Sequence, residues 1–214
     1  KKREFLRQRF FQQINRVRME NLRSRISPHF TFNVLGREIN QFNGSEEVKH
    51  NLMELVKYLR RSLELTEKLS VSLQDELDFV RTYIELERGR VGEDFVATIT
   101  VEDGLDATRI MIPSMIVQIP VENAIKHGLA GKDGKKELMV YVSRETNGIR
   151  ITVTDNGRGY LPQVVSATRG TGTGLKVLYQ TIQLLNTKNK SDKIRFNITN
   201  RSDGQTGTQV SVYI

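Results

Sequence analysis

The chain has 214 residues, no cysteine and a formal net charge of +8. This length allows one sizeable core with a helical appendage, and the lack of cysteine excludes disulfides and thiolate metal sites. No apolar run approaches the roughly 20 residues that cross a bilayer, and no signal peptide is visible. Because the chain begins at Lys1 instead of methionine, we expect it to be a piece of a longer protein.

The positive charge is concentrated at the N-terminus. Residues 1–27 contain nine Lys or Arg and two acids, a balance of +7, which leaves about +1 for residues 28–214. A basic segment before a near-neutral body argues against nucleic-acid binding, as does the lack of interleaved aromatic residues. Helical spacing predicts a continuous basic helix. It fits the cytoplasmic side of a membrane helix and, equally well, a solvated helix face.

Two amphipathic helices are predicted next, over residues 22–43 and from Ser45 onward. Pro28 removes a backbone hydrogen bond from the first, so we expect a kink beside His29 at the edge of the apolar face. A lone histidine there is ordinarily a packing residue, but its ring could also reach solvent. Ser45 is a typical helix N-cap. A single helical hairpin leaves apolar surface in water, so we expect two copies to form a four-helix bundle, and hence a homodimer.

The character of the chain changes after a third helix. Ser72 opens a capping box, and helical spacing continues to Arg88-Gly89. Alternating β-branched and polar residues then predict five strands, over residues 95–101, 137–143, 148–154, 194–199 and 208–214, with helical patterns at 114–127 and 174–187. The fold class is therefore α+β, with one antiparallel-rich sheet that carries helices on one face.

Three stretches carry residues suited to nucleotide chemistry. The first, residues 121–128, places Asn123 and Lys126 on one helical face, where the amide oxygen suits Mg²⁺ and the ammonium suits phosphate. The second, residues 155–159, places an aspartate and two glycines at a strand end, where backbone can approach a flat ring. In the third, residues 170–175, glycines precede a helix whose N-terminus can receive phosphate. We expect a mobile lid over residues 157–174.

These stretches resemble, in order and spacing, the N, G1 and G2 boxes of the Bergerat-type ATP-binding fold of histidine kinases, gyrase, Hsp90 and MutL. Residues 207–210 resemble that fold's last-strand motif. The sequence Glu-Asn-Ala-x-Lys-His-Gly, with Pro28-His29-Phe30 upstream, is similar to the LytS-type sensor histidine kinases. The resemblance implies a basic linker helix at 1–21, a dimerisation and phosphoacceptor domain at 22–90, and an ATP-binding domain of the α/β sandwich type at 91–214.

The resemblance also implies roles for single residues. His29 would be the phosphoacceptor, Asn123 would hold Mg²⁺, and Asp155 would read adenine beside Gly157 and Gly159. Further nucleotide contacts would come from Lys126, His127, Gly172, Gly174 and Thr208. The cofactors expected are therefore ATP and Mg²⁺.

The function that this resemblance implies is autophosphorylation at His29 and transfer to an aspartate of a response regulator. The protein would be the cytoplasmic portion of an inner-membrane sensor kinase, attached through an upstream segment. Ile119 stands where the hydrolysing members of the superfamily carry a glutamate that activates water, so the sequence predicts weak ATP hydrolysis. Departures around His29, including Ser27 and Thr31, keep open a catalytically weak scaffold that signals through dimer conformation.

Overall fold

The computed structural model describes residues 39, 45–160, 173–186 and 193–214. The chain divides into two compact units, residues 1–69 and 70–214. The kink at Pro28, the phosphoacceptor His29, the first helix of the hairpin and most of the expected lid lie outside the described residues. The basic helix at 1–27 lies outside them as well.

The described part of the first unit is dominated by helix α3, Glu46–Glu67. Ser45 caps it as predicted, because its hydroxyl accepts a hydrogen bond from the backbone N–H of Val48 at 3.3 Å. Three large apolar side chains of this helix are exposed, namely Val48, Met53 and Leu55. Helix α3 therefore presents apolar surface that the described residues do not cover.

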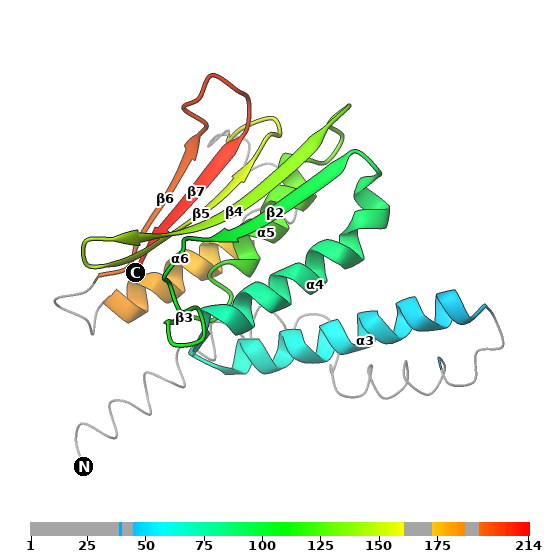
Figure 1. Cartoon of the computed structure of the whole chain (residues 1–214), viewed down its shortest axis with the longest axis horizontal. Helices are drawn as coiled ribbons and strands as arrows, with labels where there is room; N and C mark the ends of the chain where they lie inside the picture. The colour runs from blue at the N-terminus through cyan, green and yellow to red at the C-terminus, as the bar shows by residue number, and fades with distance from the viewer. Residues whose placement is uncertain (1–38, 40–44, 161–172, 187–192) are drawn as a thin grey trace, which may run out of the picture. The chain divides into compact units, whose positions relative to one another are not determined.

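The second unit is built on a five-stranded sheet with the order β2-β4-β5-β7-β6 (Figure 1). The strands are β2 (Phe95–Val101), β4 (Lys136–Glu145), β5 (Gly148–Asp155), β6 (Arg195–Asn200) and β7 (Thr208–Tyr213). All five predicted strands are confirmed to within one or two residues. Three pairings are antiparallel, but β2 lies parallel to β4, with Ile99 opposite Val140. The alternation of apolar and polar residues could not predict this parallel pairing. It shows which face of the sheet a side chain occupies, but not the direction of the neighbouring strand.

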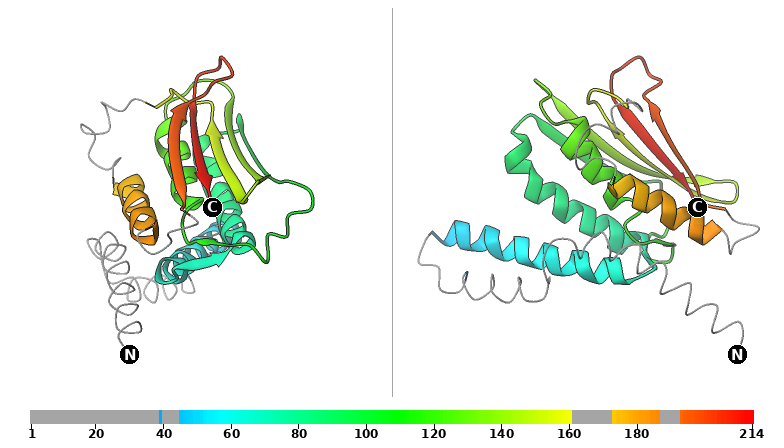
Figure 2. Two further views of the ribbon diagram at one scale, coloured as in Figure 1. Left: turned by 90° about the vertical axis from the view of Figure 1, so that its left-hand side faces the viewer. Right: turned by 180° about the vertical axis from the view of Figure 1, so that it is seen from behind.

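Three helices cover one face of this sheet (Figure 2). They are α4 (Leu73–Val91), α5 (Gln118–Asn123) and α6 (Thr173–Asn186). The buried strand residues alternate as the pleat requires, so Leu138, Val140 and Val142 of β4 face the core. A small two-stranded sheet of β1 (Ser70–Ser72) and β3 (Met111–Pro113) fixes the start of α4.

Helix α4 begins at the predicted cap. The hydroxyl of Ser72 accepts a hydrogen bond from the backbone N–H of Asp75 at 3.0 Å, which satisfies one of the free donors of the first turn. The family resemblance places this helix in the phosphoacceptor domain, whereas compactness groups it with the sheet. Compactness does not test where the functional domains begin, so the domain limits at 21/22 and 90/91 stay predictions.

The stretch predicted as one helix over 114–127 is shorter and has two parts. Helix α5 begins at Gln118 and passes into a π-helical turn, η1 (Ala124–Gly128). Just before α5, Met115 has a φ of 69°, a backbone region that side chains with a Cβ rarely adopt. Such π-helical turns occur frequently at functional sites, and this one ends at the glycine of the first nucleotide-related stretch.

A carboxylate from α4 caps α5, which has no capping side chain of its own at Val117. Glu76 is completely buried. Its Oε1 accepts hydrogen bonds from the N–H groups of Val117 at 3.1 Å and Gln118 at 3.2 Å, and its Oε2 from that of Met115 at 2.9 Å. A negative charge at a helix N-terminus also opposes the positive end of the helix dipole. Glu76 therefore fixes the position of α5 on α4.

None of the helices within the described ranges combines the length and apolar character that a bilayer crossing needs.

Replacing Glu76 by Gln is expected to lower the free energy of unfolding by about 1–3 kcal/mol, because a buried charged acceptor is lost and an amide N–H₂ faces backbone donors. Urea unfolding followed by circular dichroism measures the change. The matched control is Glu85→Gln on the same helix, where the side chain is exposed and paired with Arg88; its cost should stay below about 1 kcal/mol. Equal costs for the two variants would contradict the capping role.

Candidate functional site

The site is organised around Asp155, the last residue of β5. Its side chain is buried, and Oδ1 accepts a hydrogen bond from the N–H of Gly157 at 2.8 Å. The same oxygen accepts one from the N–H of Thr208, at the start of β7, at 3.4 Å. Two of the stretches singled out in the sequence, 155–159 and 207–210, therefore meet at one carboxylate.

Glycine backbone surrounds this carboxylate closely. A Cβ added to Gly128 would lie 2.8 Å from the carboxyl carbon of Asp155, and one added to Gly207 would lie 1.9 Å from the Asp155 carbonyl oxygen. A Cβ on Gly157 would lie 2.0 Å from the carbonyl oxygen of Gly128. Atoms cannot approach so closely, so no other residue fits these positions without a shift of the backbone. The sequence predicts Gly157 as a site residue but gives no sign of these roles for Gly128 and Gly207, because a close approach across the fold leaves no local pattern.

Burial raises the pKa of the Asp155 carboxyl above its ordinary range. The N–H groups of Gly157 and Thr208 and the charge of Arg201 act in the opposite direction, but more weakly. The Arg201 guanidinium pairs with Asp203, and the aliphatic part of the same side chain lies against Gly207. Asp155 is thus a poorly hydrated acceptor, as recognition of an amine group requires.

Gly159 holds the backbone next to this carboxylate in a left-handed conformation, with a φ of 84°. A Cβ here would lie 2.8 Å from Oδ1 of Asn200, the same oxygen that accepts a hydrogen bond from the N–H of Tyr160 at 2.6 Å. This contact with the end of β6 explains why glycine stands at position 159, whereas clearance for the adenine ring stays a prediction.

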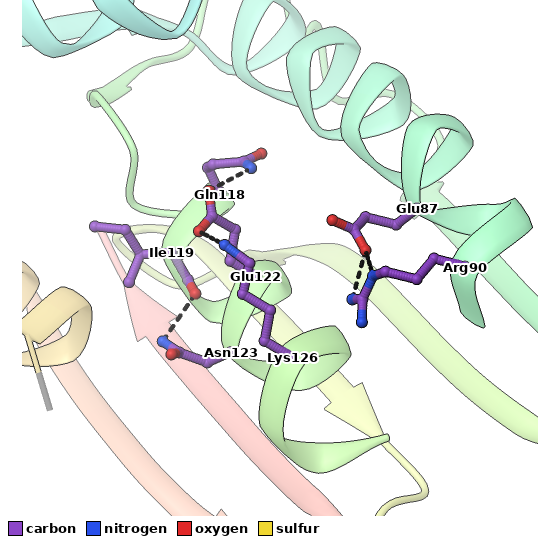
Figure 3. A network of polar contacts seen from close by, with 7 residues as sticks. All are labelled: Glu87, Arg90, Gln118, Ile119, Glu122, Asn123 and Lys126. Atoms are coloured by element: carbon purple, nitrogen blue, oxygen red, sulfur yellow. Dashed lines mark hydrogen bonds and ion pairs between the residues drawn. The ribbon is translucent and has the colours of Figure 1, made fainter. Parts of the chain in front are cut away.

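Asn123, the predicted metal contact, is the last residue of α5. Its Nδ2 donates to the carbonyl oxygen of Ile119 at 2.9 Å (Figure 3). No described group hydrogen-bonds Oδ1, so this oxygen is open to a cation. A single amide oxygen fits Mg²⁺, which ordinarily takes few protein ligands and completes its shell with phosphate and water. The described residues contain no cluster of three acidic, His or Cys side chains that could hold a metal without such help.

Lys126 lies three residues after Asn123, and its ammonium is paired with the carboxylate of Glu122. Nζ is 2.9 Å from Oε2 of Glu122 and 5.8 Å from the centre of the Tyr83 ring (Figure 3 shows the ion pair). This counter-ion was not predicted, although a glutamate four residues before a lysine is a typical helical pair. Contact of Lys126 with phosphate stays a prediction.

His127 and Arg158 lie at the junction of the first two stretches. Partial burial, followed by the charges of Lys126 and Arg158, holds the pKa of the His127 imidazole below its ordinary range, so the ring is neutral at pH 7. Nη2 of Arg158 donates to the carbonyl oxygen of Ala130 at 2.7 Å, and its backbone N–H donates to that of Gly128 at 3.4 Å. These contacts join the end of η1 to the residues that follow Asp155.

The remaining predicted contacts are placed only in part. Gly174 is the second residue of α6, at the N-terminal end where phosphate binding is expected. Gly172 and His29 lie outside the described residues. The structure therefore brings together Asn123, Lys126, His127, Asp155, Gly157, Gly159 and Thr208 around η1 and the end of β5.

Comparison with protein families gives two matches. Residues 17–95 match the histidine kinase family, and residues 108–214 match the histidine kinase-, DNA gyrase B- and HSP90-like ATPases. The second match covers half of the chain and contains every described residue of the candidate site.

Individual relatives agree with the family matches. The sensor histidine kinase YpdA of Escherichia coli is 29% identical over 80% of this chain and 31% of its own length. The sensor histidine kinase/phosphatase LytS of Staphylococcus aureus is 32% identical over 85% of this chain and 32% of its own length. The chain thus spans about a third of these relatives. The histidine kinase domain of the blue-light-activated kinase from Erythrobacter litoralis has the same fold, with a TM-score of 0.50 at 16% identity, over 95% of this chain and 93% of that one.

Replacing Gly157 by Ala is expected to lower the free energy of unfolding by about 1–3 kcal/mol, because the added methyl group overlaps the carbonyl of Gly128. Gly89→Ala is the matched control, since nothing lies within 4 Å of a Cβ at that position of α4. It should raise stability by about 0.5–1 kcal/mol, as alanine does in a helix. Chemical denaturation of both variants measures the two free energies of unfolding. A Gly157→Ala variant as stable as the unchanged protein would contradict the close packing.

The raised pKa of Asp155 makes stability depend on pH in a definite direction. Below the ordinary aspartate value near 3.8, the carboxyl is protonated in the folded and the unfolded chain. As the pH rises, Asp155 loses its proton in the unfolded chain before it does so in the folded chain. The contribution of this group to stability therefore decreases until the pH has passed the pKa of the folded state. The free energy of unfolding of the unchanged protein, minus that of Asp155→Asn, should therefore fall as the pH rises above about 4. A difference that is flat or increases with pH would show that burial is not the dominant influence on the pKa of Asp155.

Proposed function

The chain belongs to the histidine kinases, with an ATPase domain of the DNA gyrase B- and HSP90-like family, and we propose that it is the catalytic portion of a sensor histidine kinase. It binds ATP in the second unit, phosphorylates His29 and passes the phosphoryl group to an aspartate of a response regulator. The single observation that supports this most directly is the buried Asp155 carboxylate enclosed by Gly128, Gly157 and Gly207. Such an enclosure suits a flat base with an exocyclic amine.

Each residue then has one task. Asp155 accepts a hydrogen bond from the adenine amine, while Gly157 and Gly159 leave room for the ring. The open Oδ1 of Asn123 takes Mg²⁺, and the N-terminus of α6 with Gly172 and Gly174 receives phosphate. Lys126 and His127 face the phosphates, and Thr208 supports Asp155. ATP supplies the phosphoryl group and a good leaving group.

The chemical step needs one nucleophile. A neutral ring nitrogen of His29 forms a bond to the γ-phosphorus while the bond from that phosphorus to the β,γ-bridging oxygen breaks, and ADP leaves. The carbonyl oxygen of Ile119 accepts a hydrogen bond from the Asn123 amide, and the apolar side chain of Ile119 cannot activate water. The site is therefore suited to transfer of the phosphoryl group to a side chain more than to hydrolysis.

Dimerisation and membrane attachment belong to the same proposal. The exposed apolar residues of α3, Val48, Met53 and Leu55, support pairing of two copies through the helical unit. The +7 charge of residues 1–27 supports attachment to a membrane through an upstream segment.

His29→Gln is expected to abolish incorporation of labelled γ-phosphate from ATP while the affinity for ATP stays unchanged, because the nucleophile is lost and the nucleotide site is not touched. His50→Gln is the matched control, since His50 is an exposed histidine on α3. It should retain full incorporation. The phosphoprotein should be labile in acid and stable in base, as phosphohistidine is. Undiminished labelling of His29→Gln would remove that residue from the role.

A further inference from the structure

A chain of contacts runs along one face of α5 and η1 from the core to the surface. Gln118, Glu122 and Lys126 are spaced four residues apart and lie above one another (Figure 3). Nε2 of Gln118 donates to Oε1 of Glu122 at 3.1 Å, and Nζ of Lys126 donates to Oε2 of Glu122 at 2.9 Å. Both oxygens of the Glu122 carboxylate are therefore engaged.

Glu122 differs from an ordinary surface glutamate because its inner neighbour is fixed. Gln118 is completely buried, and its backbone N–H donates to the buried carboxylate of Glu76 at 3.2 Å. The Glu122 side chain itself is only 31% exposed. Its negative charge is thus held at one place and cannot swing freely into solvent.

The cations and anions around this position form two pairs. Glu87 and Arg90 of α4 pair at 2.5 Å, and Glu122 and Lys126 form the other pair. Tyr83 lies between them; burial first, then the charges of Glu122 and Glu87, raise the pKa of its phenol. Among the described residues, Lys126 is the one cation paired with Glu122. Each carboxylate therefore has its own counter-ion.

This pairing conflicts with the task that the proposed function gives to Lys126. The ammonium is neutralised by Glu122, whereas binding of a triphosphate next to Asn123 calls for a cation. Phosphate must either displace Glu122 or share the ammonium with it.

We propose that Glu122 competes with the phosphates of ATP for Lys126 and thereby sets the affinity of the nucleotide site. The inference rests on the proposed function, because it assumes that phosphate binds beside Asn123. Glu122 keeps the affinity for ATP lower than the remaining contacts would allow. The competition is specific for phosphate, so it leaves the affinity for the adenosine part unchanged.

The test uses the full chain and Glu122→Gln, which preserves shape and removes the charge. Calorimetric titration with the magnesium complex of AMPPNP should give a dissociation constant about two- to fivefold lower than that of the unchanged protein, as expected when Lys126 is released from one partly exposed ion pair. Adenosine should bind with unchanged affinity. Glu87→Gln is the matched control, because it removes a carboxylate from the same cluster without touching Lys126; it should change AMPPNP binding by less than twofold.

The double variant Lys126→Met with Glu122→Gln separates competition from simple repulsion. If Glu122 acts through Lys126, the substitution at 122 no longer tightens AMPPNP binding once Lys126 is gone. Equal tightening in both backgrounds, or weaker binding of Glu122→Gln alone, would overturn the inference.

A measurement without nucleotide distinguishes failure of the inference from failure of the proposed function. In heteronuclear NMR, the ammonium of Lys126 should give a protected signal in the unchanged protein that is lost in Glu122→Gln. Absence of that signal from the unchanged protein overturns the inference alone. A protected signal in a protein that does not bind AMPPNP overturns the proposed function and the inference with it.

Discussion

The arrangement of the site depends on one buried carboxylate, that of Glu76. Three backbone N–H groups at the start of α5 converge on it from Met115, Val117 and Gln118. Burying a charge is costly unless hydrogen bonds compensate for the lost water, and here the free donors of a helix terminus supply that compensation. The same bonds place the segment that carries Asn123 and Lys126 at a defined height on α4, so the position of these side chains follows from an interaction made about one to two turns earlier in the chain.

A second buried carboxylate, Asp155, has a different role because its surroundings differ. Glu76 is enclosed by donors from one helix terminus, whereas Asp155 is enclosed mainly by the backbone of glycines, with fewer donors. The first arrangement is complete within the protein and serves stability. The second leaves a poorly hydrated acceptor at the end of the central strand β5, which is the state expected of a group that recognises a ligand.

Helix α4 contacts both ends of the segment from Gln118 to Lys126. Glu76 lies at the start of the segment, and Tyr83 lies against Lys126 about two turns farther along α4. Between these points, hydrogen bonds from Gln118 to Glu122 and from Lys126 to Glu122 connect the core to the surface. The charge state around Lys126 is therefore a property of two helices together, and we regard the nucleotide site as including this face of α4.

Local sequence patterns are enough to predict most of the helices and strands and the chemical types at the site. Alternation predicted all five strands of the sheet, Ser45 and Ser72 marked two helix starts, and the glycine-rich stretches identified Asp155, Gly157 and Gly159, because these signals depend on neighbours within a few residues. Tertiary structure decided the parallel pairing of β2 with β4, the shortened α5 with its π-helical turn, the capping by Glu76 and the close approaches at Gly128 and Gly207. It also decided which partner Lys126 takes, although the helical spacing to Glu122 was visible. Each of these features joins residues distant in the chain or selects among several allowed partners, and the free energy that selects them arises only when the core is packed.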